Sequence, residues 1–451
     1  MKQLKRWQEP LYGIGGFGAT LMYQVAMSYI LAYYVPTASD MARGALVLAP
    51  PALFGVLFFV ARMLDGVVDI PIATWTDNLK SRFGRRRPFM VLGFLPMIAF
   101  FVLMWFPPVA APAEGGSVLN TVYLAIISVL FFFFYTMMAV PYLSALSEIV
   151  PDEKSRVRVA SWQTFFNTIA YVLVYVLVPV LFSKFGMRTT VLMLTPIMLT
   201  YLFPLFVIKE DSTLGGVNRK AEPDVGLAES FRQTVKNKNF QIYLLSLATF
   251  FFGLQLFLGG IKYMANDMMG LSDAQMGMMN AAAFAPIPLM LLLFNFITRK
   301  RGSKTAFRIS LLVFAAAMLL FPLGWTKLGL SISPMVVGIA AGAVGSFSIA
   351  AFFTIPYAYP AQIAAEDAAV TGKNRAGMFF AVQGFVNQIV GALAGSLVLA
   401  NLVSIRSEAV GTGAIFIGPV AALACVASFF LSKKLTIGQK PVTAKVEEPQ
   451  Q

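Results

Sequence analysis

Histidine is absent from the 451-residue chain, and Cys425 is its single cysteine. Without histidine, the chain has no imidazole metal ligands and no imidazole proton relays. One cysteine forms no intramolecular disulfide, and we expect a small buried hydrophobe there. Charged residues make up only 12% of the chain and hydrophobic ones 58%, whereas soluble proteins have about 25% and about 45–50%. This composition, with a mean hydropathy of +0.73, is typical of a polytopic membrane protein.

Motifs for nucleotide chemistry are missing as well. The chain has no G-x-x-x-x-G-K-[ST] loop, so ATP is not expected to drive it directly. The glycine-rich run GIGGFG (13–18) begins an apolar segment and follows no strand, which favours close helix packing over phosphate binding. No catalytic residue and no cofactor are predicted, and the chain is not expected to be an enzyme.

Twelve apolar stretches are long enough to cross a bilayer, which takes about 20 residues. They lie at residues 11–35, 44–71, 88–107, 118–146, 157–183, 189–208, 240–265, 273–298, 306–326, 332–359, 376–403 and 410–432. The predicted fold class is an all-α membrane protein with twelve transmembrane helices in two six-helix halves. Its parts are an N-terminal half (1–208), a central loop (209–239), a C-terminal half (240–432) and a tail (433–451).

Lysine and arginine are sorted between the two sides of these spans. The side that carries the termini has 28 of the 35 basic residues, the other side has six, and Arg62 lies within a span. Basic loops stay in the cytoplasm, so both termini, the central loop and the tail are predicted to be cytoplasmic. The same sorting explains the net charge of +14 without a nucleic-acid partner. The short termini carry no evident eukaryotic targeting signal, which favours a bacterial inner membrane.

The two halves carry matching motifs. WQTFFNTI (162–169) and VQGFVNQI (382–389) share the pattern Q-x-F-x-N-x-I, and VPYLSALSEI (140–149) corresponds to IPYAYPAQIA (355–364). Two parallel six-helix repeats are the layout of the major facilitator fold. In that fold the substrate site lies between the halves, near the membrane midplane.

Charged residues interrupt the second span. In ARMLDGVVDIP (61–71), Arg62, Asp65 and Asp69 step by three and four residues, so they share one helix face. Ionisable residues inside a membrane are costly and usually functional. Two carboxylates suit Na⁺, or H⁺ when one of them is protonated. The alternative is an Arg62–Asp65 pair that holds this helix against a neighbour, with Asp69 near the water boundary.

The longer run ARMLDGVVDIPIATWTDNLKSRFGRRRPFM (61–90) resembles helix two and loop 2–3 of the glycoside–pentoside–hexuronide:cation symporters, the melibiose permease family. Residues 12–23, 135–166 and 371–395 extend the resemblance over most of the chain. The resemblance implies a secondary active transporter that moves a sugar, glycoside or related small solute together with Na⁺ or H⁺ by alternating access. It also implies a protein that needs no cofactor and acts as a monomer in the bilayer.

The resemblance implies a cation site made of Asp65, Asp69 and Thr136, where the two aspartates would bind Na⁺ if sodium is the coupling ion. Val68 replaces the family's helix-two asparagine, and Gln388 replaces a helix-eleven lysine.

This chain differs from the family more at the sugar-binding positions than at the cation site. Thr20, Ala139, Leu143 and Thr164 stand where galactoside binders have two aspartates, a tryptophan and an arginine, while Tyr135 is kept. The remaining polar candidates for substrate binding are Thr20, Gln24, Tyr135, Thr164, Gln163, Asn167, Gln383, Asn387 and Gln388. For the paired glutamines and asparagines of the repeated motif, the alternative is hydrogen bonding between helices.

Charges in the loops on the terminal side suggest a gate. Pairs across the halves would hold that side closed, and the candidates are Asp77, Arg85, Arg156, Glu366 and Arg375. The alternative is that these charges lie in solvent, where a pair contributes about 0–1 kcal/mol.

Two other functions stay open. A less polar cavity favours a cation-coupled transporter of lysolipids or other amphipathic molecules. Spans rich in methionine and phenylalanine favour a drug-type H⁺ antiporter. A membrane receptor without transport activity would have no use for the paired carboxylates.

Overall fold

The computed structural model describes residues 4–149, 153–210, 227–371, 375–406 and 411–436. Helices, turns and short connections account for all of these ranges, which include no strand. Within the helices, the side chains of Asp69, Asp77 and Arg156 lie outside the described residues.

The N-terminal half contains six spanning segments and a short helix between the first two. They are α1 (Glu9–Gly13) with α2 (Gly15–Tyr34), α3 (Ala38–Ala42), α4 (Pro51–Asn78), α5 (Arg87–Leu103), α6 (Val118–Ile149), α7 (Glu153–Val172) with η2 (Leu173–Leu177) and α8 (Val178–Phe185), and α9 (Met187–Met198) with η3 (Leu199–Leu202) and α10 (Phe203–Val207).

The C-terminal half repeats this organisation after α11 (Leu227–Lys236). Its segments are α12 (Lys238–Tyr263) with η4 (Met264–Met268), α13 (Asp273–Phe284) with α14 (Ile287–Arg301), α15 (Ser303–Leu320) with η5 (Phe321–Gly324), α16 (Pro334–Phe352) with α17 (Ile355–Thr371), α18 (Ala376–Ala392) with η7 (Leu393–Val398) and α19 (Leu399–Ser404), and η8 (Gly413–Phe416) with α20 (Ile417–Ser432).

The predicted twelve-helix fold is confirmed. Eleven of the described segments are long and apolar enough to cross a membrane, and α5 is a shorter apolar helix. The second segment begins at Pro51, later than predicted, because proline at the first helical position fixes a suitable backbone angle. The helix ends at Asn78, beyond the predicted end of the span at residue 71.

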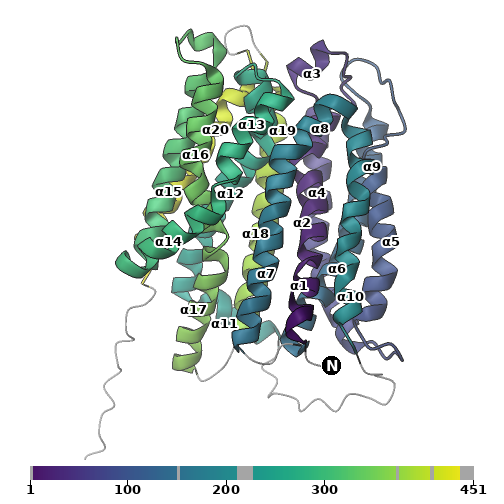
Figure 1. Ribbon diagram of the computed structural model, residues 1–451, viewed down its shortest axis with the longest axis vertical. Helices are drawn as coiled ribbons and strands as arrows, with labels where there is room; N and C mark the ends of the chain where they lie inside the picture. The colour runs from purple at the N-terminus through teal and green to yellow at the C-terminus, as the bar shows by residue number, and fades with distance from the viewer. Residues whose placement is uncertain (1–3, 150–152, 211–226, 372–374, 407–410, 437–451) are drawn as a thin grey trace, which may run out of the picture.

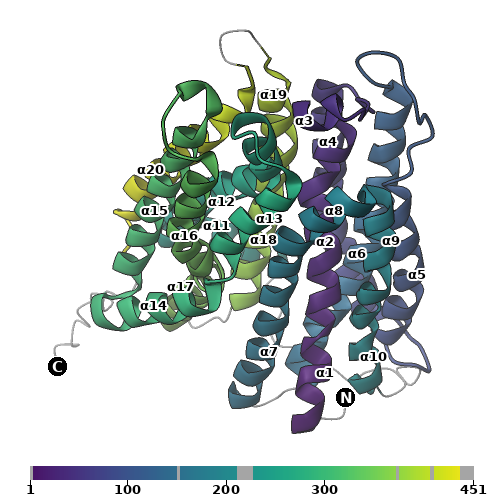
Figure 2. The same ribbon diagram turned by 45° about the horizontal axis from the view of Figure 1, so that its top comes forward.

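The two halves lie side by side, with purple-to-teal helices in one and green-to-yellow helices in the other (Figure 1). At the interface α4 contacts α18, η7 and α19, α2 contacts α12, and α13 contacts η2 and α8. We call the end of the bundle where α1 begins the terminal end. The opposite end, which carries α3 and α19, is the far end (Figures 1 and 2).

Glycines bring helix backbones together in two places. A Cβ on Gly277 of α13 would lie 2.7 Å from the Val176 carbonyl oxygen of η2, so only glycine permits this crossing of the halves. In GIGGFG, a Cβ on Gly13 would lie 2.7 Å from Trp162 Cβ, and one on Gly18 would lie 2.7 Å from Thr200 Oγ1. The glycine-rich run therefore serves helix packing, as the sequence indicates.

Candidate functional site

A buried ion pair lies in α4. Arg62 Nη1 lies 2.5 Å from Asp65 Oδ2, and Arg62 Nη2 donates a hydrogen bond to the Tyr23 hydroxyl at 2.8 Å. The side chains of Arg62 and Asp65 are only 2% and 4% exposed. The guanidinium carbon also lies 4.1 Å from the centroid of the Phe132 ring. Because an unpaired buried charge is very costly, the contact with Arg62 offsets part of the cost of a charged Asp65.

A second helix reaches the same carboxylate. Thr136 of α6 donates a hydrogen bond from Oγ1 to Asp65 Oδ1 at 3.2 Å. The structure thus brings Asp65 and Thr136 together, as the predicted cation site requires. Asp69 lies one turn further along α4, and its side chain is outside the described residues. Arg62 occupies one Asp65 oxygen, so a coupling cation that binds there must share this carboxylate with a guanidinium.

A helix from the other half approaches this cluster. A Cβ on Gly66, the neighbour of Asp65, would lie 3.4 Å from Phe385 Cδ2 and 3.5 Å from Gln388 Oε1. Gln388 of α18 therefore lies directly beside the helix that carries the candidate cation site.

Three predicted substrate residues take part in a ladder of hydrogen bonds between α2 and the continuous segment formed by α7 and η2. Successive pairs are one helical turn apart, so the same faces of the two helices stay in contact. The pairs are Thr20 with Asn167 (3.1 Å), Gln24 with Tyr171 (2.8 Å) and Ser28 with Tyr175 (2.6 Å). Interhelical hydrogen bonding, the alternative drawn from the sequence, describes Asn167 in this conformation.

The glutamines of the repeated motif also bond within their own halves. Gln163 donates to the Tyr142 hydroxyl at 2.9 Å. Gln383 accepts from the Tyr243 hydroxyl at 2.5 Å and donates to the Pro356 carbonyl at 2.9 Å. The repeat in the sequence therefore marks equivalent helix contacts in the two halves.

The remaining candidates have fewer polar contacts. The Tyr135 ring is partly buried, and its centroid lies 5.7 Å from that of Tyr23. Thr164 is partly buried on α7. Asn387 Oδ1 is buried and has no hydrogen-bond partner among the described residues.

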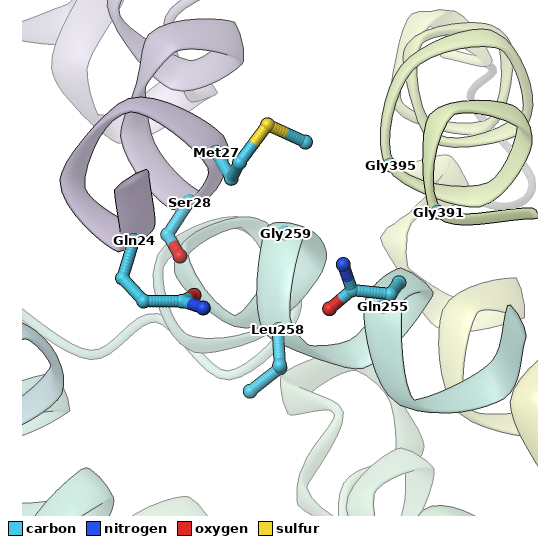
Figure 3. A pocket seen from close by; sticks show the side chains of 8 residues that line it. All are labelled: Gln24, Met27, Ser28, Gln255, Leu258, Gly259, Gly391 and Gly395. Carbon is cyan, nitrogen blue, oxygen red and sulfur yellow. The ribbon is translucent and has the colours of Figure 1, made fainter. Parts of the chain in front are cut away.

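A small cavity lies where the two halves meet (Figure 3). Its volume is about 10 Å³, and it is lined by Gln24, Met27, Ser28, Gln255, Leu258, Gly259, Gly391 and Gly395. This is room for about one water molecule, whereas ligand pockets usually hold about 300–1,000 Å³, so a bound sugar requires the halves to move apart. Gln24 was predicted from the sequence. Gln255 was missed, although an isolated amide within the apolar run FFFGLQLFLGG was a visible signal.

An ion cluster at the far end joins the halves and was also missed. Lys262 Nζ of α12 lies 2.7 Å from Asp273 Oδ1 of α13 and 3.1 Å from Asp40 Oδ2 of α3. The Lys262 side chain is only 6% exposed. Arg43 pairs with Asp40 and lies 3.5 Å from Asp273. Nearby, the Ala38 amide donates to Asp267 Oδ1 at 2.7 Å.

The charges of this cluster set the protonation of Asp40. Burial raises the pKa of Asp40. Lys262 and Arg43 lower this pKa by more than burial raises it, so the net pKa is below its ordinary value. The hydrogen bond that Arg43 donates to Asp40 in turn raises the pKa of Arg43. Both groups are therefore charged at neutral pH, and the attraction between the halves is maintained.

At the terminal end, Arg375 and Glu366 have described partners in the C-terminal part of the chain. Arg375 Nη2 lies 2.6 Å from Asp367 Oδ2, and Nη1 bonds to Gln233 of α11. Glu366 accepts a hydrogen bond from Gln362 at 3.3 Å, within the same helix. In this conformation the described partners of Arg375 are thus Asp367, eight residues earlier in the chain, and Gln233.

The other predicted gate residues lie on the N-terminal half. Arg85 is buried, and the backbone amides of Arg86 and Arg87 donate to Glu210 Oε2 at 2.9 and 3.0 Å. The side chains of Asp77 and Arg156 lie outside the described residues. The gating role of this group stays a prediction.

Comparisons with known proteins agree with this architecture. Residues 11–412 match the model of the family described as MFS/sugar transport protein. The inner membrane symporter YicJ of Escherichia coli (strain K12) is 27% identical over 175 residues, 39% of this chain and 35% of that protein. The glucuronide carrier protein homolog of the same organism is 22% identical over 88% of this chain and 83% of that protein. The raffinose carrier protein of Pediococcus pentosaceus is 23% identical over 54% of this chain and 39% of that protein.

For the first curated relatives, the aligned part covers about a third of their length, namely 33%, 36% and 30%. Among solved structures, a mutant of the nucleoside transporter NupG has a TM-score of 0.66 at 12% identity and covers 95% of this chain and 99% of its own. A POT family transporter in complex with 5-aminolevulinic acid has a TM-score of 0.66 at 13% identity, with coverages of 97% and 99%. At these identities the structures establish the fold alone.

Proposed function

Because this chain belongs to the MFS/sugar transport protein family, we propose that it is a membrane transporter that couples the movement of a sugar or glycoside to that of Na⁺ or H⁺. Its family is one of transporters rather than enzymes, and its helices are those of an integral membrane protein. The relatives named as carriers of glucuronide and raffinose support a sugar or glycoside as the solute.

One observation carries the coupling proposal: Asp65 is a buried carboxylate whose charge partner, Arg62, lies on its own helix. When no coupling cation is bound, Arg62 neutralises Asp65, so the empty site does not hold an isolated charge. When a cation binds at Asp65 and Asp69, it takes over part of that role. Thr136 supplies a neutral oxygen beside the same carboxylate. Na⁺ is a hard cation that prefers such oxygen ligands, and H⁺ would occupy a carboxylate oxygen directly.

Solute binding is placed next to this site, in the cavity between the halves. Gln388 and Phe385 of α18 lie against Gly66, so a shift of α18 that admits the solute also changes the surroundings of Asp65. By linkage, each ligand then raises the affinity for the other by the same factor. Rocking of the halves about this region gives alternating access.

We place the terminal end in the cytoplasm, because most lysines and arginines lie on that side. In the conformation described here, the Lys262–Asp40 ion pair joins the halves at the far end. A bacterial inner membrane fits this orientation.

The test is uptake into proteoliposomes with an imposed Na⁺ or pH gradient. Radiolabelled raffinose, methyl glucoside and glucuronate serve as probes, beside a lysolipid. We expect cation-driven accumulation of a sugar that is lost in Asp65→Asn. Glu114→Gln, which changes an exposed carboxylate in a loop, is the matched control and should keep full activity. Full gradient-driven accumulation by Asp65→Asn would refute the coupling site, and lysolipid uptake in place of sugar uptake would refute the solute class.

A further inference from the structure

Gln255 is an amide side chain within the membrane that none of the predicted roles uses. It lies on α12 and points into the cavity, opposite Gln24 and Ser28 of α2 (Figure 3). Gln24 and Ser28 are held in place by Tyr171 and Tyr175. Gln255 is partly buried and has no hydrogen-bond partner among the residues that the structure describes. An amide without a partner is unfavourable in this setting, so a ligand or water must supply one.

The neighbouring helix leaves room for this amide. A Cβ on Gly391 of α18 would lie 3.3 Å from Gln255 Nε2 and 3.1 Å from Phe251 Cε1. Glycine at 391 therefore keeps α18 clear of the Gln255 side chain. Asn387 lies one turn earlier on the same face of α18, and its buried Oδ1 also has no described partner. The C-terminal half thus brings two amides to the region where the halves meet: Gln255, which is partly exposed, and Asn387, whose Oδ1 is buried without a described partner.

We propose that Gln255 is a substrate-contacting residue that selects uncharged, hydroxyl-rich solutes and binds them from the C-terminal half while Gln24 and Ser28 bind them from the N-terminal half. This inference rests on the proposed function. An amide offers both a donor and an acceptor, which matches a sugar hydroxyl, itself a donor and an acceptor. The eight residues that line the cavity include no lysine or arginine to pair with a carboxylate or sulfonate. A solute bound in this way bridges the two halves, which ties its binding to their movement.

The test compares glutamines on one helix. Gln255→Ala removes the amide from the cavity, and Gln241→Ala removes one at the exposed start of α12. Uptake of methyl glucoside, raffinose and glucuronate is measured in proteoliposomes as KM and maximal rate. We expect Gln255→Ala to raise KM for an uncharged sugar at least tenfold, about 1.4 kcal/mol in binding, with a maximal rate within twofold of wild type. Gln241→Ala should leave both values within twofold.

A second variant tests the geometry without removing the amide. Gly391→Ala places a methyl group against Gln255 Nε2, so it should raise KM in the same direction. Unchanged KM values in both variants, or a fall in the maximal rate alone, would overturn the inference and leave the proposed function standing. Preference of the wild type for glucuronate would overturn the selectivity for uncharged solutes. Absence of any sugar uptake by the wild type would overturn the proposed function, and the inference with it.

Discussion

The two ends of the helix bundle use their charges in opposite ways. At the far end, Lys262 of the C-terminal half is buried between Asp273 of its own half and Asp40 of the other. At the terminal end, ion pairs between described side chains stay within one half, as in Arg375–Asp367 and Arg158–Glu9. An ion pair therefore joins the halves at the far end, whereas the two described pairs of the terminal end, Arg375–Asp367 and Arg158–Glu9, each stabilise one half.

The same comparison separates two effects of a mutation. Breaking a pair that joins the halves changes the balance between conformations, because only one conformation contains that pair. Breaking a pair within a half lowers the stability of both conformations alike. A distance across the far end distinguishes these effects. Spin labels on Ala42→Cys of α3 and Met278→Cys of α13, both exposed positions, report that distance when the buried Cys425 is replaced by alanine.

The largest effect is expected from Lys262→Met. Removal of the ammonium leaves Asp40 and Asp273 with only the half-exposed Arg43 as a shared cation. Loss of one partner of a buried ion pair costs about 3–5 kcal/mol. We expect the distance between the labels to shift to longer values and transport to fall. Lys327→Met, at an exposed far-end lysine, is the control. An unchanged distance distribution in Lys262→Met would show that the cluster does not hold the halves together.

Asp367→Asn is expected to have a smaller effect, which lowers the stability of the protein and leaves its conformation unchanged. Arg375 keeps its bond to Gln233, so the loss of its carboxylate costs about 1–3 kcal/mol. The melting temperature should fall in detergent, while the distance across the far end should stay as in the parent protein. A longer far-end distance in this variant would contradict the separation of the two ends.

Acid should weaken the far end without any mutation. The pKa of Asp40 is lowered in the folded protein, so its contribution is complete above its ordinary pKa and is lost as the pH falls through the lowered value. The ordinary pKa of aspartate is about 3.9, so the lengthening of the label distance that depends on Asp40 should appear below about pH 4. Lys262, Arg43 and Asp273 face the same carboxylate. Asp40→Asn should show the longer distance at neutral pH and no further change in acid.

The sequence predicted the parts of this molecule that depend on local pattern. The length of the apolar stretches predicted the twelve spans. The spacing of Arg62 and Asp65 predicted that the two residues share one helix face. The contact of Thr136 with Asp65 followed from a family resemblance, and cation binding there stays a prediction. The far-end cluster was not predicted, because Asp40 and Lys262 lie far apart in the chain and belong to no repeated motif. Gln255 was missed although the sequence shows an isolated amide in an apolar run, and its position opposite Gln24 follows only from the fold.

The smallest effect is expected from Arg158→Gln. The Arg158 guanidinium lies 2.8 Å from Glu9 Oε1, but its side chain is 41% exposed. Solvent screens such a pair, so its loss should cost no more than about 1 kcal/mol. Because both residues belong to the N-terminal half, neither the label distance nor the KM for sugar should change. A shift of the far-end distance by Arg158→Gln would mean that charges within one half bias the opening of the other end, and the contrast between the two ends would then be wrong.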